Sequence, residues 1–302
     1  MDNKNVFVAI ALSMAVLLFW GAFFETPRQV KENHSIDKVQ TNQNEIQGNI
    51  TPSINQETVI KKISRDDALT EVDRVIIENE KVKGSISLKG AIFDDLSFKN
   101  YKKDLKSGEN VIFLNPKEIE DGYYIESGWT SIGNEVEVPG VDSLWQVKGN
   151  RVLSEKNNVV LEWNNGKGLI FKKTIKLDDK YLFKIKQEVQ NNTSTKINLY
   201  PYAQITRNKK PDDVMGFYIL HEGFIGVFDG ELKEDDYDDI EEKKAVRNSD
   251  NGWLGITDKY WVTAIVPPKD KNFKSTFLYK DNFRANYILN SPVEVKPNST
   301  SD

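Results

Sequence analysis

Apolar and polar residues alternate through much of the chain, and this period of two is the feature that most limits its fold. Between Val82 and Lys89 every second residue is Val, Gly, Ile or Leu, and the residues between them are Lys or Ser. Every second residue is also apolar in three further segments, with Lys173 as the exception: Val159–Trp163, Leu169–Leu177 and Tyr181–Ile185. Such alternation, with Asn- and Gly-rich turns between segments, predicts half-buried antiparallel strands. The sequence therefore predicts a mainly β fold of the sandwich or barrel class.

A single apolar run precedes this region. Val6–Phe24 contains 19 residues and no charge. As a helix it would be about 28 Å long, close to the roughly 30 Å of a bilayer's hydrocarbon core. No small-residue cleavage site follows Phe24, and Trp20 lies near the exit end, where amphipathic rings suit a membrane interface. We predict an uncleaved transmembrane signal anchor over residues 1–24, with a cleaved signal peptide as the alternative.

The segment after the anchor has a different composition. Residues 25–66 are rich in Asn, Gln, Thr and Lys, and no aromatic residue occurs between Phe24 and Phe93. A segment of this kind buries too little apolar surface to offset the entropy lost on ordering. We therefore predict a flexible polar linker over residues 25–66 and one large β domain over residues 67–302.

Composition excludes several classes of function. The chain has no Cys, two His and a net charge of −5, so it offers no thiolate or multi-histidine metal site and no basic patch for nucleic acid. In the acidic stretch Glu231–Glu242, Ile240 stands where a calcium ligand should fall, and the Gly of a calcium loop is missing. His221 would need a second titratable partner for acid–base catalysis. We expect no catalytic residue, no metal, no cofactor and no nucleic-acid partner.

The most informative soluble stretch is Gly252–Pro268, GWLGITDKYWVTAIVPP. We expect a strand over Trp253–Ile256, a tight connection at Asp258 and Lys259, and a second strand over Tyr260–Val266, both in the core between sheets. The β region also holds five tryptophans, which we interpret as core residues, with a sugar-stacking platform as the alternative; these are Trp129, Trp145, Trp163, Trp253 and Trp261.

Three segments, with the anchor and linker before them, resemble the YidC membrane protein insertase family of Gram-negative bacteria. They are Lys89–Lys103, Glu222–Gly230 and the stretch Gly252–Pro268. The residues that carry the resemblance in the last stretch are expected to be structural: Gly252, Trp253, Gly255, Asp258, Tyr260, Trp261 and Pro267.

The resemblance implies a periplasmic β-supersandwich similar to galactose mutarotases, held by an inner-membrane anchor whose N-terminus is cytoplasmic. The lysines and arginines around the anchor leave that orientation open. The family inserts, folds and assembles inner-membrane proteins, alone or with the Sec translocon. The implied partners are nascent inner-membrane proteins, the Sec translocon with its accessory subunits, and the lipid bilayer.

The family's substrate groove lies in later transmembrane helices, and no second apolar run of 18 residues occurs in this sequence. We therefore expect this chain to be the N-terminal portion of an insertase, without insertion activity alone. Two alternatives stay open: a bitopic periplasmic adaptor, and a carbohydrate-binding domain without catalysis. Mutarotases use a histidine pair, whereas the predicted β domain holds His221 alone, with His34 in the linker.

Overall fold

The computed structural model describes residues 12–16, 60–61, 63–104, 106, 108–131, 136–212, 214 and 221–302. Contacts divide the chain into Met1–Ile46 and Gln47–Asp302, and we call the second part the β unit. In the first part, the described residues Leu12–Val16 are helical. The anchor residues Val6, Trp20 and Phe24 lie outside the described residues, within which no helix is long and apolar enough to cross a bilayer. The anchor, the linker and the boundary at residue 67 stay predictions.

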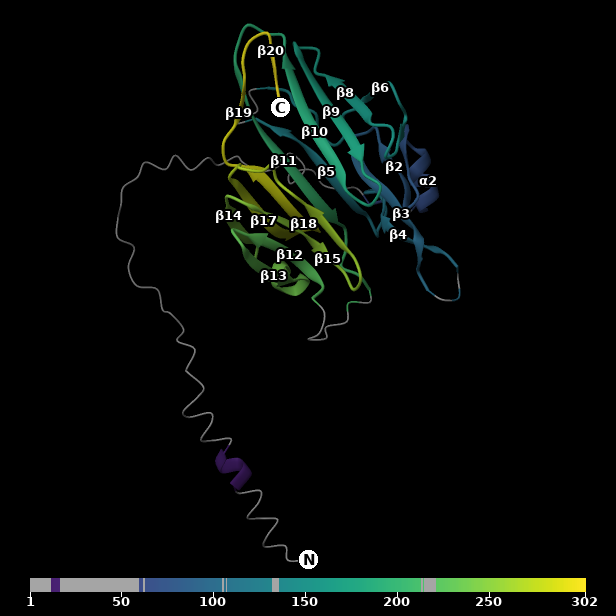
Figure 1. Ribbon diagram of the computed structural model, residues 1–302, viewed down its shortest axis with the longest axis vertical. Helices are drawn as coiled ribbons and strands as arrows, with labels where there is room; N and C mark the ends of the chain where they lie inside the picture. Colours follow the sequence, from purple (N-terminus) through teal and green to yellow (C-terminus); the bar gives the residue numbers. More distant parts are fainter. Residues whose placement is uncertain are drawn as a thin grey trace, which may run out of the picture. The chain divides into compact units, whose positions relative to one another are not determined.

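The β unit is built on one large sheet (Figure 1). Nine strands run side by side in the order β14-β17-β18-β11-β5-β3-β2-β1-β7, while β4 pairs with β3 and β19 pairs with β11. In chain order these strands are β1 (Arg74–Glu78), β2 (Val82–Ser87), β3 (Ile92–Lys102), β4 (Asn110–Leu114), β5 (Tyr123–Thr130), β7 (Val152–Leu153), β11 (Ile197–Arg207), β14 (Ala245–Ser249), β17 (Phe273–Lys280), β18 (Asn282–Leu289) and β19 (Val293–Val295).

Two smaller sheets complete the β unit. The five-stranded sheet has the order β20-β10-β9-β8-β6, and the four-stranded sheet the order β13-β12-β15-β16. Their strands are β6 (Gln146–Lys148), β8 (Val159–Asn164), β9 (Leu169–Leu177), β10 (Phe183–Asn191), β20 (Ser299–Ser301), β12 (Gly223–Phe228), β13 (Glu231–Asp236), β15 (Gly252–Thr257) and β16 (Val262–Ile265). The mainly β fold predicted from alternation is confirmed, including the antiparallel pairing of β8 with β9.

Both smaller sheets pack on the large one through aromatic side chains. Phe93 of β3 meets Phe183 of β10 with ring centroids 5.4 Å apart. Phe224 of β12 lies 5.0 Å from Phe277 of β17, and both rings are fully buried. Burying a ring of this size stabilises the fold by about 1.5–3 kcal/mol. Buried residues of all three sheets belong to one hydrophobic cluster, so the sheets share one apolar core.

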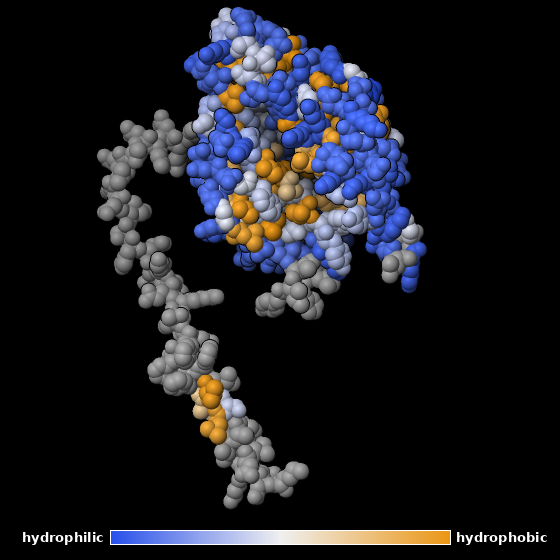
Figure 2. All heavy atoms as spheres, in the orientation of Figure 1, coloured by the Kyte–Doolittle hydropathy of each residue, from blue (hydrophilic) through white to orange (hydrophobic). Residues whose placement is uncertain are grey.

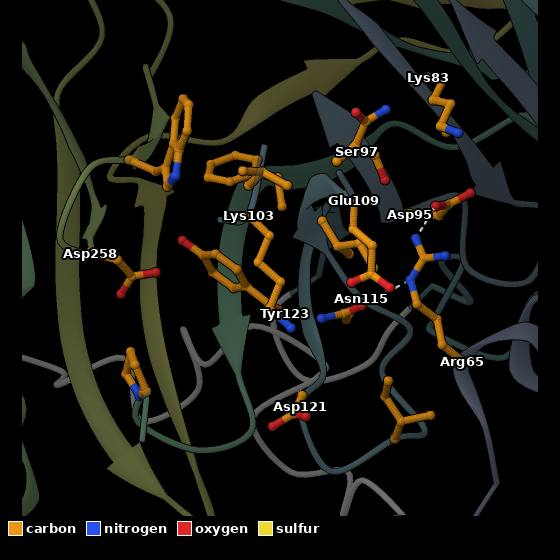
Figure 3. A pocket seen from close by; sticks show the side chains of 18 of the residues that line it. Arg65, Lys83, Asp95, Ser97, Lys103, Glu109, Asn115, Asp121, Tyr123 and Asp258 are labelled. Atoms are coloured by element: carbon orange, nitrogen blue, oxygen red, sulfur yellow. Dashed lines mark hydrogen bonds and ion pairs between the residues drawn. The ribbon is translucent and has the colours of Figure 1, made fainter. Parts of the chain in front are cut away.

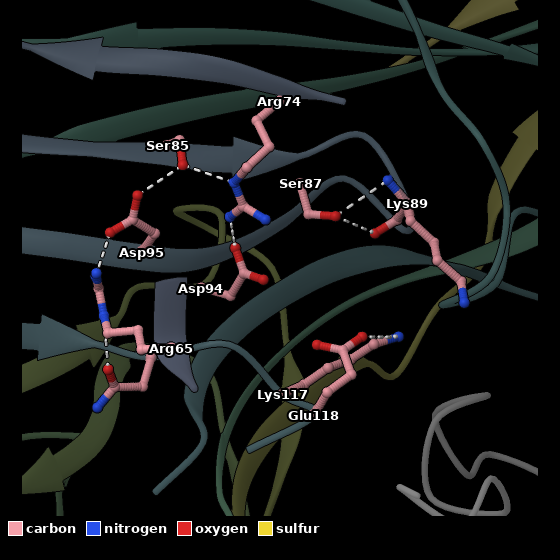
Figure 4. A network of polar contacts seen from close by, with 10 residues as sticks. Arg65, Arg74, Ser85, Ser87, Lys89, Asp94, Asp95, Lys117 and Glu118 are labelled. Carbon is pink, nitrogen blue, oxygen red and sulfur yellow. Dashed lines mark hydrogen bonds and ion pairs between the residues drawn. The ribbon is translucent and has the colours of Figure 1, made fainter. Parts of the chain in front are cut away.

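The short helix α2 (Arg65–Thr70) is held to the large sheet by a polar network (Figure 4). Arg65 contacts Asp95, Asp95 accepts a hydrogen bond from the Ser85 hydroxyl, and that hydroxyl accepts one from Nε of Arg74. Arg74 also pairs with the buried Asp94. Burial raises the pKa of Asp94 to about 6, although the charge of Arg74 opposes the shift. The network therefore links α2 to β1, β2 and β3 of the large sheet.

The acidic stretch Glu231–Glu242 forms β13 and then a second short helix, α3 (Tyr237–Glu242). Strand β13 is an exposed edge strand, and its charges discourage pairing with a further strand. The helix was not expected. It places Tyr237 and Ile240 in the core while its carboxylates face solvent. A helix of six residues is too short for this helical spacing of apolar residues to be recognised in the sequence.

Candidate binding cleft

An apolar cleft of about 480 Å³ lies where the three sheets meet. Its floor is formed by β3, β4, β5, β11 and β18, one wall by the start of β10, and the other wall by β16. None of the residues that line it is charged. Figure 2 shows hydrophobic side chains gathered in a hollow between polar regions, on the face of the β unit that is in view. Volume and lining are typical of a ligand-binding pocket.

The wall formed by β16 is unusual because seven consecutive residues, Tyr260–Val266, line the cleft. Successive side chains of a strand point to opposite faces, so an unbroken run of lining residues means that the backbone edge itself borders the cleft. Val262 and Val266 are 50% and 67% exposed, whereas Thr263 and Ile265 are buried. The prediction that both strands of this hairpin lie in the core is wrong for β16, because an uninterrupted apolar run does not distinguish a buried strand from one beside an open cleft.

Trp261 is the centre of an aromatic cluster at the mouth of the cleft. Its ring lies 4.5 Å from that of Phe98 and 4.8 Å from that of Tyr101, measured between centroids. Phe98 also meets Tyr181, which precedes β10, at 5.6 Å. The cluster therefore joins β3, the connection before β10 and the β15–β16 turn, three segments far apart in sequence.

Asp258 holds the β15–β16 turn in place. Its carboxylate pairs with Nη1 of Arg207 at 2.5 Å and accepts a hydrogen bond from the Tyr237 hydroxyl at 3.1 Å. Its backbone N–H donates to the carbonyl of Trp261 at 2.8 Å. Burial and the nearby charge of Asp258 raise the pKa of Tyr237 well above its usual value, so this hydroxyl stays a donor. The position of Trp261 thus depends on a side chain that is part of the resemblance segment.

Two glycines let β15 pack closely against its neighbours. A Cβ on Gly252 would lie 1.9 Å from the Val227 carbonyl oxygen, and Gly252 has φ +148°. A Cβ on Gly255 would lie 2.2 Å from the carbonyl oxygen of Thr263 in β16. No larger residue fits either position without moving a strand.

A buried lysine lies beside the inner part of the cleft. Lys173 of β9 is 3% exposed, donates to the Ser127 carbonyl at 2.6 Å and lies over the Trp145 ring at 4.9 Å. Burial lowers the pKa of Lys173 to about 8, and the charge of Glu126 opposes the shift. Ser127 and Gln187, the β10 neighbour of Lys173, both line the cleft. The apolar cleft therefore has a small polar group of residues on one side.

A broad polar trough of about 1430 Å³ adjoins the cleft (Figure 3). Trp261 and Phe113 line both the trough and the cleft. Its charges are mixed in sign and close to one another: Arg65 contacts Asp95, and Lys209 pairs with Asp121 at 3.0 Å. Because cations and carboxylates are paired with one another across the trough, it favours neither an anionic nor a cationic ligand. We therefore place the candidate site in the apolar cleft.

The structure separates the residues singled out from sequence. Tyr260 and Trp261 line the cleft, with Tyr260 75% exposed, and Asp258 lines the adjoining trough. Gly252 and Gly255 set strand spacing, while Trp253 is half-buried on β15 and Pro267 is buried after β16. Their assigned structural role stays a prediction. The sequence analysis did not identify the wall of the cleft that is formed by Tyr181, Leu182 and β10. The one sign of this wall in the sequence is Leu182, an apolar residue at a position where the alternation predicts a polar one.

His221 contacts two strands of the four-stranded sheet. Its Nε2 lies 2.8 Å from the Phe224 carbonyl and its Nδ1 lies 3.2 Å from the Asp236 carboxylate. Among the described residues, no group of three or more His, Asp or Glu side chains could hold a metal ion. His221 therefore links β13 to the start of β12.

Comparison with known proteins identifies the family. The YidC periplasmic domain matches residues 74–302. The membrane protein insertase YidC of Pelagibacter ubique is 46% identical over 302 residues, which cover 99% of this chain and 53% of that protein. The chain spans about half the length of the curated relatives it matches.

Two solved structures align with 76% of this chain at low identity. A protein from Synechocystis sp. PCC 6803 has a TM-score of 0.49 and 10% identity, with 93% of its chain covered. A galactose mutarotase related enzyme from Lactobacillus acidophilus has a TM-score of 0.46 and 9% identity, with 94% covered. Since the domain match and the insertase relative both cover most of the sequence, the chain belongs to the YidC family of membrane protein insertases, and its residues 74–302 match the periplasmic domain of that family.

Proposed function

We propose that this chain is the N-terminal half of an insertase that inserts, folds and assembles inner-membrane proteins. The observation that carries the proposal is the match of 99% of the chain to about half of an insertase at 46% identity. In this proposal the β unit lies in the periplasm, residues 6–24 anchor it with the N-terminus in the cytoplasm, and membrane-embedded parts of the full protein carry out the insertion step. Nascent inner-membrane proteins and the bilayer are the proposed partners, together with the Sec translocon.

The β unit is proposed to act by binding and without catalysis. The cleft is lined by apolar and aromatic side chains, with Ser127, Gln187 and Thr263 as its aliphatic polar groups. A sugar presents several hydroxyls that need hydrogen-bond partners once water is displaced. The lining has no charged group, and its other polar atoms belong to aromatic side chains, the hydroxyls of four tyrosines and the Trp261 indole. We therefore propose an apolar ligand rather than a carbohydrate, and His221 makes backbone and edge-strand contacts away from the cleft.

A chimera tests the proposal. This chain replaces the matching half of the Pelagibacter ubique insertase, and the chimera is reconstituted in proteoliposomes with a single-span client protein. We expect insertion of the client at a rate comparable to that of the parent insertase. A chimera that is folded and membrane-embedded yet inactive, beside an active parent, would contradict the proposal.

A further inference from the structure

Three connections of the β unit meet at one end: the β1–β2 turn, the β3–β4 hairpin and the β9–β10 turn. Asn79 in the first turn donates its side-chain amide to the Asp178 carbonyl in the third turn at 3.2 Å. Lys99 of β3 donates to the Asn79 carbonyl at 2.8 Å. Figure 1 shows that β3 and β4 extend as a hairpin beyond the neighbouring strands. We call this group the turn cluster; its residues are 78–83, 99–104, 106, 108–110 and 176–184.

The turn cluster exposes aromatic and aliphatic side chains. Tyr101 and Tyr181 both pack against Phe98, with ring centroids 6.0 Å and 5.6 Å from it, yet they stay 45% and 41% exposed. Leu182, next to Tyr181, is 55% exposed. Tyrosine rings have an apolar body and a polar tip, which suits the interface between lipid and water. These side chains therefore fit the headgroup region of a bilayer.

The turn cluster is positively charged although the chain as a whole is acidic. It holds nine lysines and six carboxylates, a net charge of +3, whereas the whole chain has a net charge of −5. Two of the carboxylates have partners within the fold. Glu78 pairs with Lys99 at 3.2 Å, and the Asp178 carboxylate accepts hydrogen bonds from two backbone N–H groups of its own turn. The excess charge therefore belongs to exposed lysines.

Two of these lysines lie directly opposite each other beside the β9–β10 turn. Lys184 of β10 is the cross-strand partner of Lys176 of β9, and both side chains are exposed. Like charges in this arrangement destabilise a sheet. The ion pairs that the described residues form on this face of the five-stranded sheet join other side chains. An external anionic surface would relieve the repulsion between the two lysines.

We infer that the turn cluster docks on the anionic surface of a phospholipid bilayer. Each lysine close to such a surface strengthens binding about fivefold, and the exposed tyrosines and Leu182 enter the headgroup region. The acidic stretch Glu231–Glu242, with eight carboxylates and one lysine, lies on another side of the β unit (Figure 1), so the same surface repels it. Attraction at one side and repulsion at the other orient the β unit with its β3–β4 hairpin toward the lipid.

The chain enters the β unit beside this hairpin. Arg65 of α2 donates to the side chain of Asn115, the residue after β4, at 3.0 Å and contacts Asp95 of β3. The choice of a bilayer as partner rests on the proposed function, in which residues 6–24 anchor the β unit to a membrane. A tethered surface meets its partner at a raised effective concentration, so a modest affinity is enough for docking.

Fluorescence quenching tests the inference with the whole 302-residue chain in lipid nanodiscs. Because the chain has no Cys, one fluorescent label can be attached at Asn100→Cys on β3 or at Leu232→Cys on β13, both exposed positions. The quencher is a nitroxide on the lipid headgroup, and the lipid is phosphatidylcholine with or without phosphatidylglycerol. We expect strong quenching at position 100 and little at 232 in the anionic discs. Quenching at 100 should be lost in neutral discs, and also in about 1 M salt, where the Debye length is about 3 Å.

A double variant separates docking from folding. Lys176→Gln, Lys184→Gln should weaken docking at least roughly tenfold. Its urea midpoint should equal or exceed that of wild type, because repulsion between the two lysines is removed. The matched control, Lys243→Gln, Lys244→Gln, makes the same change in net charge at exposed positions after α3. This control should leave docking within about twofold.

Three results would overturn the inference. They are similar quenching at positions 100 and 232 in anionic discs, quenching at 100 that persists in neutral discs, and an equal effect of the control variant. Absence of quenching at either position counts among the first, and would leave the lysines to an acidic protein surface. A chimera that inserts its client while the label at position 100 stays unquenched would refute docking and leave the proposed function intact.

Discussion

Replacing Lys173 with Met should change how the stability of the β unit depends on pH. The pKa of Lys173 is lowered from its ordinary value of 10.5 to about 8 because the ammonium group is buried. Between pH 8 and pH 10.5 the unfolded chain therefore binds more protons than the folded chain, and stability due to this group rises with pH. The full difference corresponds to about 3 kcal/mol, of which about 2 kcal/mol falls between pH 7 and pH 9.5.

The assay is urea unfolding of wild type and Lys173→Met at several pH values, followed by far-UV circular dichroism. Loss of the contacts with Ser127 and Trp145 shifts the variant by an amount independent of pH, so the difference between the two curves isolates the titration. We expect wild type to gain about 2 kcal/mol relative to the variant from pH 7 to pH 9.5. Parallel curves would refute the assignment of a buried, charged lysine.

Three further predictions follow from close contacts and buried charges. Gly252→Ala should lower the free energy of unfolding in urea by about 3 kcal/mol or more, because the added Cβ would overlap a carbonyl oxygen. Gly230→Ala is the control and should cost about 1–2 kcal/mol, because Gly230 has φ +87° but no atom within 4 Å of the added Cβ. Equal costs for the two variants would contradict this reasoning. Burial raises the pKa of Asp94 to about 6, so on acidification the folded chain takes up this proton at a higher pH than the unfolded chain does. The free energy of unfolding of wild type should therefore rise by about 1 kcal/mol relative to that of Asp94→Asn from pH 7 to pH 5. A fall in this difference would contradict the raised pKa. Asp258→Ala should destabilise the fold by about 2 kcal/mol, because it leaves the half-buried Arg207 without its carboxylate partner, and unchanged stability would contradict the importance of that pair.

The alternation of apolar and polar residues is enough to predict those strands whose hydrogen-bonded neighbours are close in sequence. The β8–β9 hairpin follows from alternation on both sides of an Asn- and Gly-rich turn, and its register joins Val159 to Ile175. The period-two rule also placed Lys173 on the inward face, although the sequence did not show what a lysine does there. In the structure the Lys173 ammonium group donates a hydrogen bond to the Ser127 carbonyl and lies over the Trp145 ring.

Contacts between distant segments were not accessible from sequence. Strand β11 lies between β5 and β18, and β1 pairs in parallel with β7. The cleft arises from such pairings, since its walls, β10 and β16, belong to different sheets. For the same reason the expectation that Tyr260–Val266 lies in the core is wrong, because this apolar run borders the cleft. Hydrophobicity alone does not distinguish a strand in the core from one beside an open cleft.

Site-specific photo-crosslinking in the full insertase tests the central claim most directly. A photoreactive amino acid replaces Val262 on β16 or, as the control, Leu232 on the charged edge strand β13; the two residues are 50% and 56% exposed. In membranes that are inserting a single-span client, we predict adducts of an apolar ligand at position 262 and none at position 232. Equal adducts at both positions, or none at 262 during insertion, would contradict the claim that the apolar cleft is the binding site of the β unit.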